Sequence, residues 1–271
     1  MNARNSLVIR SGGLGDFILT LPLIDSLRAV GPVVLVTRPS YAALVAEDDL
    51  YDSWLSVDGP EMLALDAGTK PFALGDRRAW SVYSFLRLSA AGRHGWASYR
   101  ELASRPVLPP HVARRMFIDA GIREPSDLLQ TAVLQRAQEP QRPCLWLHPG
   151  SGSAAKNAPL DEYRRRAASW RAEHPQGDIV VSIGEADMAL LDEARRTFAE
   201  VGALIRVQPT LPELRQELAA RATAFVSNDT GVSHLAAALG IPTTAIFRAT
   251  SPDLWRPLGP QVDCPRWPAP R

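Results

Sequence analysis

Short apolar runs alternate with longer amphipathic segments along most of this chain. In the first half, apolar runs at 6–10 and 32–38 flank a helix-length segment at 16–30. A shorter helical segment at 41–47 and a short apolar run near 54–58 follow. Strands that alternate with helix-length segments are typical of a parallel sheet covered by helices. The first half is therefore predicted to form an α/β domain.

The pattern weakens after residue 59, where Gly, Pro and Trp are scattered without a clear period. Helices are predicted there near 79–89 and 111–121. The polar, proline-bearing segment 134–143 lacks periodicity and is the best linker candidate. The predicted domains are residues 1–138 and 139–271.

The pattern is clearer in the second half. Five strands are predicted, at 144–148, 178–184, 203–207, 223–228 and 243–247. Four helices alternate with them, one that begins near Leu160 and three at 185–202, 211–220 and 232–240. This alternation predicts a doubly wound, Rossmann-like domain. The whole chain is therefore expected to form two such domains that face a cleft.

Composition and charge exclude several classes of protein. Hydrophobic residues make up 46% of the 271 residues and charged residues 22%, and the net charge is +1. That charge balance gives no electrostatic basis for binding nucleic acid. The two cysteines, Cys144 and Cys264, lack a CxxC partner, so a structural zinc site is not expected. Neither a signal peptide nor a transmembrane helix is expected. The expected location is cytoplasmic, with at most peripheral contact at the inner membrane face.

The stretch "SGGLGDFILTLP" (11–22) resembles a phosphate-binding loop between a strand and a helix. Its glycine spacing fails the G-x-G-x-x-G pattern at Ile18, and no acidic residue ends the second strand. Asp16 also places a carboxylate where a helix N-terminus would attract a phosphate. Two compatible roles remain open for Asp16: a helix N-cap, or a general base at the carboxyl edge of a parallel sheet.

Two stretches of the second half are candidates for binding an anion. In "HPGSGSAAKNAP" (148–159), backbone N–H groups, hydroxyls and Lys156 suit a diphosphate, although a surface loop with a solvated lysine would look the same. In "SNDTGVSHLAAALG" (227–240), the N–H groups of Thr230 and Gly231 open a helix. The alternative there is Asp229 as an N-cap and His234 as a helix-packing side chain.

Taken together in this order, the three stretches resemble glycosyltransferase family 9, the ADP-heptose:lipopolysaccharide heptosyltransferases. The residues that carry the resemblance are "GGLGDFILTLPLIDSLR", "HPGSGSAAKNAPLDEYRRRA" and "SNDTGVSHLAAALGIPTTAIFRATSPDLWRP". The resemblance implies a GT-B fold and inverting, metal-independent glycosyl transfer without a cofactor. It also implies that Asp16 deprotonates the acceptor hydroxyl.

The same resemblance implies a donor site in the second domain. The implied donor-binding residues are Ser151, Ser153, Lys156, Glu185, Asp229, Thr230, Gly231 and His234. Glu185 is the candidate for the ribose contact, with Asp187 as the alternative alignment.

The expected donor is a nucleotide sugar, most simply ADP-heptose. The expected acceptor is a hydroxyl group of a glycan, a lipid-linked molecule or a small molecule, and no nucleic acid is involved. The alternative hypothesis is a non-catalytic nucleotide-sugar-binding or scaffold protein of the same fold. An NAD-dependent epimerase or dehydrogenase is disfavoured because the dinucleotide fingerprint fails.

Overall fold

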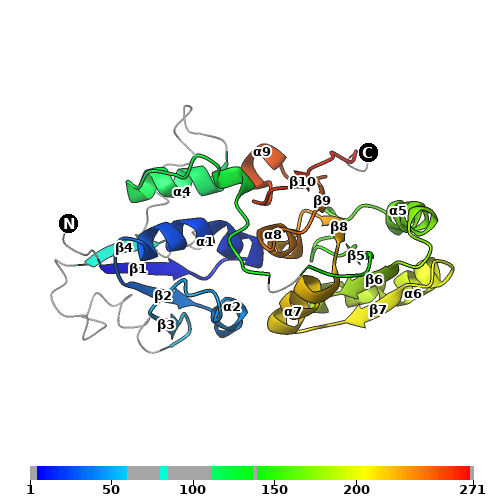
Figure 1. Cartoon of the computed structure of the whole chain (residues 1–271), viewed down its shortest axis with the longest axis horizontal. Helices are drawn as coiled ribbons and strands as arrows, with labels where there is room; N and C mark the ends of the chain where they lie inside the picture. Colours follow the sequence, from blue (N-terminus) through cyan, green and yellow to red (C-terminus); the bar gives the residue numbers. More distant parts are fainter. Residues whose placement is uncertain (1–4, 60–79, 85–110, 137–138, 269–271) are drawn as a thin grey trace. The chain divides into compact units, whose positions relative to one another are not determined.

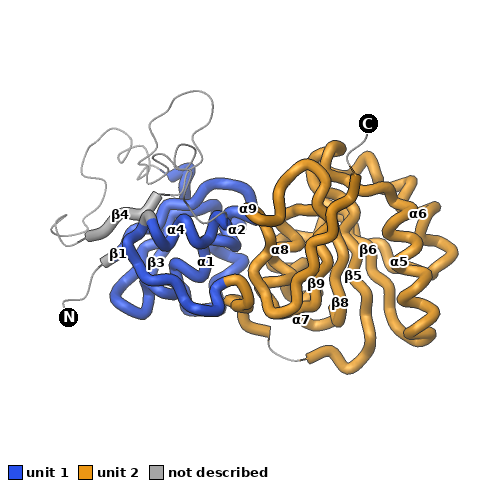
Figure 2. Tube along the Cα trace, turned by 90° about the horizontal axis from the view of Figure 1, so that it is seen from above, with its two compact units in different colours: residues 1–128 blue, residues 129–271 orange. Residues whose placement is uncertain are grey.

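The computed structural model describes residues 5–59, 80–84, 111–136 and 139–268. The chain divides into two compact units, which Figure 2 shows in different colours: unit 1, residues 1–128, and unit 2, residues 129–271. The predicted boundary between residues 138 and 139 lies ten residues beyond this division.

Unit 1 contains a four-stranded parallel sheet with the order β3-β2-β1-β4. Its strands are β1 (Asn5–Arg10), β2 (Val33–Thr37), β3 (Ser53–Ser56) and β4 (Trp80–Ser84). Its α-helices are α1 (Leu14–Arg28), α2 (Pro39–Leu44) and α4 (Val112–Ala120), and a 3₁₀ turn at Leu128–Gln130 lies at the division. Helix α1 packs against α4 (Figure 1).

The helix predicted near 79–89 is wrong over residues 80–84. These residues form β4, which pairs in parallel with β1 from Asn5↔Trp80 to Ile9↔Ser84. The sequence Trp-Ser-Val-Tyr-Ser contains aromatic and β-branched residues, which are common in strands, but no clear alternation of apolar and polar positions. Five residues are too few for a sequence pattern to distinguish a strand from a helix, and here the pairing with β1 determines the strand. The rest of that predicted helix lies outside the described residues.

Unit 2 contains a six-stranded parallel sheet with the order β10-β9-β8-β5-β6-β7. The strands are β5 (Cys144–His148), β6 (Asp178–Ile183), β7 (Leu204–Val207), β8 (Ala224–Asn228), β9 (Thr243–Ile246) and β10 (Val262–Asp263). The helices are α5 (Leu160–Glu173), η3 (Glu185–Leu190, 3₁₀), α6 (Leu191–Ala199), α7 (Leu211–Arg221), α8 (Gly231–Ala238) and α9 (Pro252–Trp255). Counted from β5, this is the Rossmann order 3-2-1-4-5-6. The five predicted strands are confirmed, and the sequence pattern missed the two-residue strand β10 and the short helix α9.

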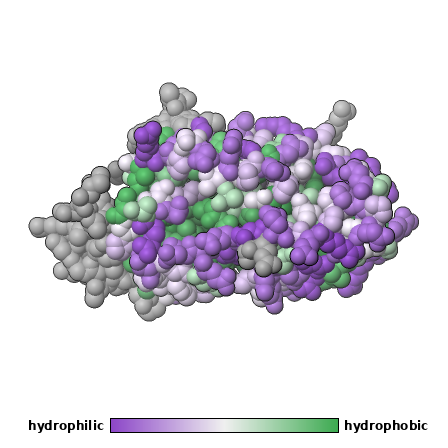
Figure 3. All heavy atoms as spheres, viewed as in Figure 1, coloured by the Kyte–Doolittle hydropathy of each residue, from purple (hydrophilic) through white to green (hydrophobic). Residues whose placement is uncertain are grey.

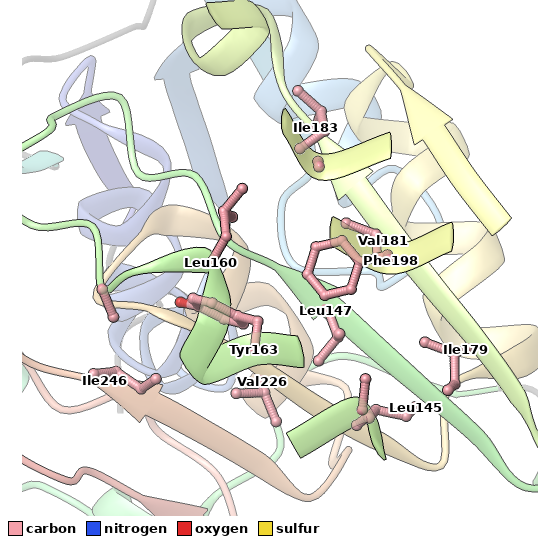
Figure 4. Close-up of a cluster of buried hydrophobic side chains, with 13 residues drawn as sticks. Leu145, Leu147, Leu160, Tyr163, Ile179, Val181, Ile183, Phe198, Val226 and Ile246 are labelled. Atoms are coloured by element: carbon pink, nitrogen blue, oxygen red, sulfur yellow. The ribbon is translucent and has the colours of Figure 1, made fainter. Parts of the chain in front are cut away.

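Helices cover both faces of the unit 2 sheet. Helices α5 and α6 lie on one face, and α7 and α8 lie on the other (Figures 1 and 2). In Figure 4, Tyr163 of α5 and Phe198 of α6 lie among side chains of the strands, and both are fully buried. Burying one such side chain contributes about 1.5–3 kcal/mol, so this packing fixes how the strand ends are arranged.

The beginning of unit 2 is held to its helices by specific contacts. The backbone N–H of Leu134 donates to the carbonyl of Ala238 in α8. The Arg136 guanidinium donates to the carbonyls of Ala219 and Ala222 at the end of α7. The described part of the predicted linker therefore packs against the helices of unit 2. Hydrophobic periodicity could not reveal this, because the contacts come from the backbone and from a charged side chain.

The face of unit 2 that Figure 3 shows is polar around α5 and α6. Figure 3 shows mainly hydrophilic residues over the part of unit 2 where Figure 1 labels α5 and α6. Among the described residues, no helix is both long and apolar enough to cross a membrane.

Candidate functional site

Asp16 lies in the first turn of α1, directly after the carboxyl end of β1. The N-cap of this helix is Gly13, whose N–H donates to Asp16 Oδ2 at 3.2 Å. The prediction that Asp16 is the N-cap is therefore wrong by three positions. Asp16 is the third residue of the helix, and its side chain reaches back to the backbone of the N-cap. The Asp16 side chain is 21% exposed, so the carboxylate is still accessible to a ligand.

A buried arginine pairs with Asp16. Nη2 of Arg10 lies 3.1 Å from Asp16 Oδ1, and Nε donates to the main-chain carbonyl of Asp16 at 3.2 Å. The Arg10 side chain is only 1% exposed, although it lies at the end of an apolar strand. Arginine is rarely buried without a charged partner. That rule could have indicated Arg10 from the sequence, but the sequence analysis missed it.

Tyr41 supports the same glycine turn. Its hydroxyl donates to the carbonyl of Gly12 at 3.2 Å, and its ring stacks on Phe17 with the centroids 4.9 Å apart. Burial is the main cause that raises the pKa of Tyr41, so the hydroxyl keeps its proton and remains a donor. The turn that carries Asp16 is therefore fixed from both the strand side and the helix side.

In unit 2, the loop after β5 is closed by Asp187. The Asp187 carboxylate accepts from the backbone N–H groups of Ser151 and Gly152, each at 3.1 Å. A Cβ atom on Gly150 would come within 2.3 Å of this carboxylate, so only glycine fits there. Asp187 breaks the helix predicted over 185–202, because its backbone is non-helical (φ −116°, ψ 16°) inside η3. Glu185 is exposed at the start of η3.

The side chain of Lys156 reaches from this loop to the strand-end carboxylate Asp229. Lys156 Nζ lies 2.9 Å from Asp229 Oδ2, and the hydroxyl of Thr250 donates to the same oxygen. Lys156 is 31% exposed and Asp229 is 7% exposed. One of the three Nζ hydrogens meets Asp229, so the partly exposed ammonium group can still donate to a ligand.

The interpretation of Asp229 as an N-cap is wrong. Thr230 is the N-cap of α8, and its N–H donates to Ser233 Oγ at 3.4 Å. Gly231 is the first residue of α8, a position where the backbone N–H has no partner within the helix. His234 is buried, and its Nε2 lies 4.0 Å from Asp229 Oδ1. The structure thus brings Lys156, Asp229 and His234 together. The N–H of Thr230 is already bonded to Ser233, so Gly231 carries the first N–H of α8 that could meet a ligand.

Asn228, which was not among the predicted site residues, connects the two loops of this site. Its side-chain oxygen accepts from the N–H of Ala158 at 2.8 Å, and its amide nitrogen donates to the carbonyl of Pro149. Ser151 Oγ donates to the side-chain oxygen of Asn157 at 2.6 Å. Asn228 is fully buried at the end of β8, so it fixes both ends of the loop to the sheet.

Two further residues shape the loop. The Ser153 side chain is exposed, and its carbonyl accepts from the N–H of Lys156 and from Ser151 Oγ. Arg248, at the end of β9, donates to the carbonyl of Asn157. Ser153 therefore shapes the turn through its backbone, and Arg248 holds the loop segment that carries Lys156.

His148, the last residue of β5, is a buried neutral histidine. Complete burial lowers the pKa of His148 to about 4, while the Asp187 charge acts in the opposite direction. Nδ1 lies 2.9 Å from the hydroxyl of Ser182. Because this pKa lies well below neutral pH, the imidazole is uncharged near pH 7 and acts as a structural group under the loop.

Acidification is expected to destabilise the protein through His148. A histidine with a lowered folded-state pKa leaves stability unaffected above its unfolded-state pKa near 6.5 and costs stability as the pH falls toward 4. The loss is on the order of 3 kcal/mol at pH 4. Urea unfolding at pH 7, 5.5 and 4 would measure it. His148→Asn, which can still bond Ser182, should show a smaller loss; an equal loss would contradict this assignment.

No group of three or more His, Cys, Asp or Glu side chains in the described part of the chain is arranged to hold a metal ion. Burial is the main cause that raises the pKa of both Cys144 and Cys264 to about 11. Both thiols therefore stay protonated near neutral pH and are weak ligands and nucleophiles.

The unit 2 site lies at the switch point of its sheet. Strands β5 and β8 are neighbours, and their connections leave in opposite directions along the sheet. Open α/β sheets bind ligands in the crevice beyond this point. The loop of Lys156 and the start of α8 both follow these strands. Fold and site together define a doubly wound, Rossmann-type protein of the GT-B class, with a candidate anion-binding site at this edge.

Comparison with known proteins identifies the family. The model of glycosyltransferase family 9 (heptosyltransferase) matches residues 77–269. The chain belongs to this family and is a glycosyltransferase. A provisionally named glycosyltransferase of Haemophilus influenzae is 24% identical in an alignment of 297 positions, which covers 93% of this chain and 85% of that protein.

Solved structures share the fold. The glycosyltransferase family 9 protein of Veillonella parvula has a TM-score of 0.66 at 15% identity, covering 99% of this chain and 87% of that one. The ADP-heptose lps heptosyltransferase II of E. coli has a TM-score of 0.65 at 19% identity, covering 96% and 89%. E. coli heptosyltransferase WaaC with ADP has the same TM-score at 18% identity, covering 97% and 93%. These similarities confirm the predicted GT-B fold.

Proposed function

We propose that this protein transfers a heptose from ADP-heptose to a hydroxyl group of a glycan acceptor, with inversion and without a metal ion. Unit 2 binds the donor, and Asp16 of unit 1 is the general base. The observation that carries the proposal is the pairing of Lys156 with Asp229 beside the N-terminus of α8, at the switch point of unit 2. Unit 1 accordingly serves the acceptor.

The donor assignment follows from charge. A departing nucleoside diphosphate develops negative charge that a metal-free site must neutralise with fixed donors. Lys156 supplies a cation, and the N-terminus of α8 supplies an N–H group and a positive dipole end. E. coli heptosyltransferase WaaC, whose fold is similar, has been solved with ADP and with ADP-2-deoxy-2-fluoro heptose. These complexes support adenine and heptose as the donor's parts.

Smaller roles complete the donor site in this proposal. Ser151 and Ser153 shape the phosphate loop, Thr230 begins α8, and His234 lies against Asp229. Glu185 is the candidate for the ribose hydroxyls because it is exposed at the strand end, whereas the Asp187 carboxylate is already bonded to the loop.

The reaction is a single displacement at the anomeric carbon. The acceptor oxygen attacks, its proton passes to the Asp16 carboxylate, and the carbon–oxygen bond to the diphosphate breaks. Asp16 suits the base role because its carboxylate is held in place yet is partly exposed. TibC of E. coli, a similar structure, is an iron-containing glycosyltransferase, so unchanged turnover after chelator treatment is the test of metal independence.

Ligand-dependent thermal unfolding tests the donor. ADP at about 100 times its Kd should stabilise the protein by about 2.7 kcal/mol, whereas UDP and GDP at the same concentration should have little effect. That stabilisation would raise the unfolding midpoint by several degrees. Equal stabilisation by UDP would contradict ADP-heptose as the donor.

Turnover tests the transferase activity. ADP release from ADP-heptose should depend on a hydroxyl acceptor such as heptose-deficient lipopolysaccharide. Binding of ADP with no ADP release over hours, with or without this acceptor, would favour the non-catalytic alternative. Family membership and the intact Asp16 turn support catalysis.

A further inference from the structure

We infer that Arg10 is a positioning residue for the general base: its guanidinium fixes the orientation of the Asp16 carboxylate for proton transfer. This inference rests on the proposed role of Asp16. It adds a residue that the sequence motif does not contain and that the donor site does not use.

Arg10 contacts Asp16 at two points. Nη2 lies 3.1 Å from Oδ1, and Nε donates to the Asp16 carbonyl at 3.2 Å. The planar guanidinium cannot make both contacts in more than a narrow range of orientations. The same carbonyl also accepts from Thr20 Oγ1 at 2.9 Å, so the backbone beside the carboxylate is fixed as well.

The two carboxylate oxygens of Asp16 have different partners. Oδ1 faces Arg10, and Oδ2 accepts from the N–H of Gly13 at 3.2 Å. A carboxylate offers about four lone-pair sites, so these two partners stop rotation of the group without using all of its acceptor capacity. With the side chain 21% exposed, the remaining capacity can meet an acceptor hydroxyl.

Arg10 is itself held rigidly. It is the last residue of β1, paired with Thr37 of β2, and its carbonyl accepts from Thr37 Oγ1 at 2.7 Å. Both residues are buried. Through Arg10, the sheet as well as the glycine turn therefore determines the orientation of the Asp16 carboxylate. Sites supported by regular elements are held more precisely than sites on loops.

The chemical consequence concerns the transition state. The hydroxyl proton moves to Asp16 as the new glycosidic bond forms and the bond to the diphosphate breaks. Arg10 keeps its own protons throughout, since a guanidinium is not deprotonated in proteins. A base that is misplaced by about 1 Å can cost about 100-fold in rate. Loss of Arg10 should therefore lower kcat and leave donor binding intact.

A double-mutant cycle tests this inference. Arg10→Met, Asp16→Asn and the double variant are assayed for ADP release from ADP-heptose with heptose-deficient lipopolysaccharide as acceptor. Arg10→Met alone should lower kcat about 10- to 100-fold with KM for ADP-heptose unchanged. In the Asp16→Asn background it should have no further effect, because Arg10 acts through Asp16. Arg10→Lys, which keeps the charge, should recover part of kcat.

Controls separate positioning from stability. Arg28→Met removes the same charge from the other end of α1, where Arg28 pairs with Asp49 and Asp52, and should leave kcat unchanged. Unfolding midpoints of all variants are measured. If Arg10→Met does not fold, Arg10→Lys carries the test with a smaller expected loss of about 3- to 10-fold, because lysine cannot make both contacts.

The outcomes distinguish the two claims. Unchanged turnover in Asp16→Asn, or no turnover in the wild type, contradicts the proposed function and with it this inference. A large loss in Asp16→Asn combined with wild-type kcat in the Arg10 variants overturns this inference alone. Additive losses from Arg10→Met and Asp16→Asn also overturn it, since they would mean that Arg10 acts on turnover independently of the base.

Discussion

Replacing Asp16 by asparagine is expected to lower kcat by about 10²- to 10⁴-fold, the usual contribution of general base catalysis. The asparagine side-chain oxygen can still accept from the N–H of Gly13, so the first turn of α1 should form normally. ADP binding should be unchanged, because the proposed donor residues belong to unit 2. Steady-state ADP release and an ADP titration would measure the two effects.

The matched control for this variant is Asp25→Asn. Asp25 is an exposed residue of the same helix, so the control changes the charge equally without touching the turn. Asp16→Asn also removes the charge of a carboxylate that the buried Arg10 contacts, and some loss of stability is expected. Wild-type turnover in Asp16→Asn would exclude Asp16 as the base.

Replacing Lys156 by methionine is expected to weaken ADP binding by about 10- to 150-fold, which corresponds to the loss of about 1.5–3 kcal/mol for a charged hydrogen bond. Lys156 Nζ lies 2.9 Å from Asp229 Oδ2, and its removal leaves that carboxylate, among the described residues, with Thr250 and the more distant His234. The added negative field would repel a diphosphate. Calorimetric titration with ADP would measure the loss.

Two comparisons show whether the charge or the shape of Lys156 matters. Lys156→Arg should retain most of the affinity, because it keeps a cation beside Asp229. Asp229→Asn combined with Lys156→Met should recover part of the affinity, because it removes the unpaired carboxylate. Unchanged ADP affinity in Lys156→Met would place the diphosphate elsewhere and would contradict the proposed donor site.

Much of the fold could be predicted from local patterns. The strands at 6–10 and 144–148 are continuous apolar runs, which buried parallel strands produce, and both are confirmed. The segment 80–84 was mistaken for a helix because five residues contain too little periodicity to identify a strand. Element boundaries shifted for a similar reason: α1 begins at Leu14 because a side chain three residues into the helix caps it.

By itself the sequence determined the fold class, the family and the candidate residues, because glycine turns, apolar strands and the order of the motifs are all local properties of the chain. Only the tertiary structure decided which side chains meet. Arg10 pairs with Asp16 six residues away, Lys156 meets Asp229 across 73 residues, and Asp187 closes the loop at Ser151. Such pairs depend on strand order and packing, which bring the strand ends together and which no local pattern encodes.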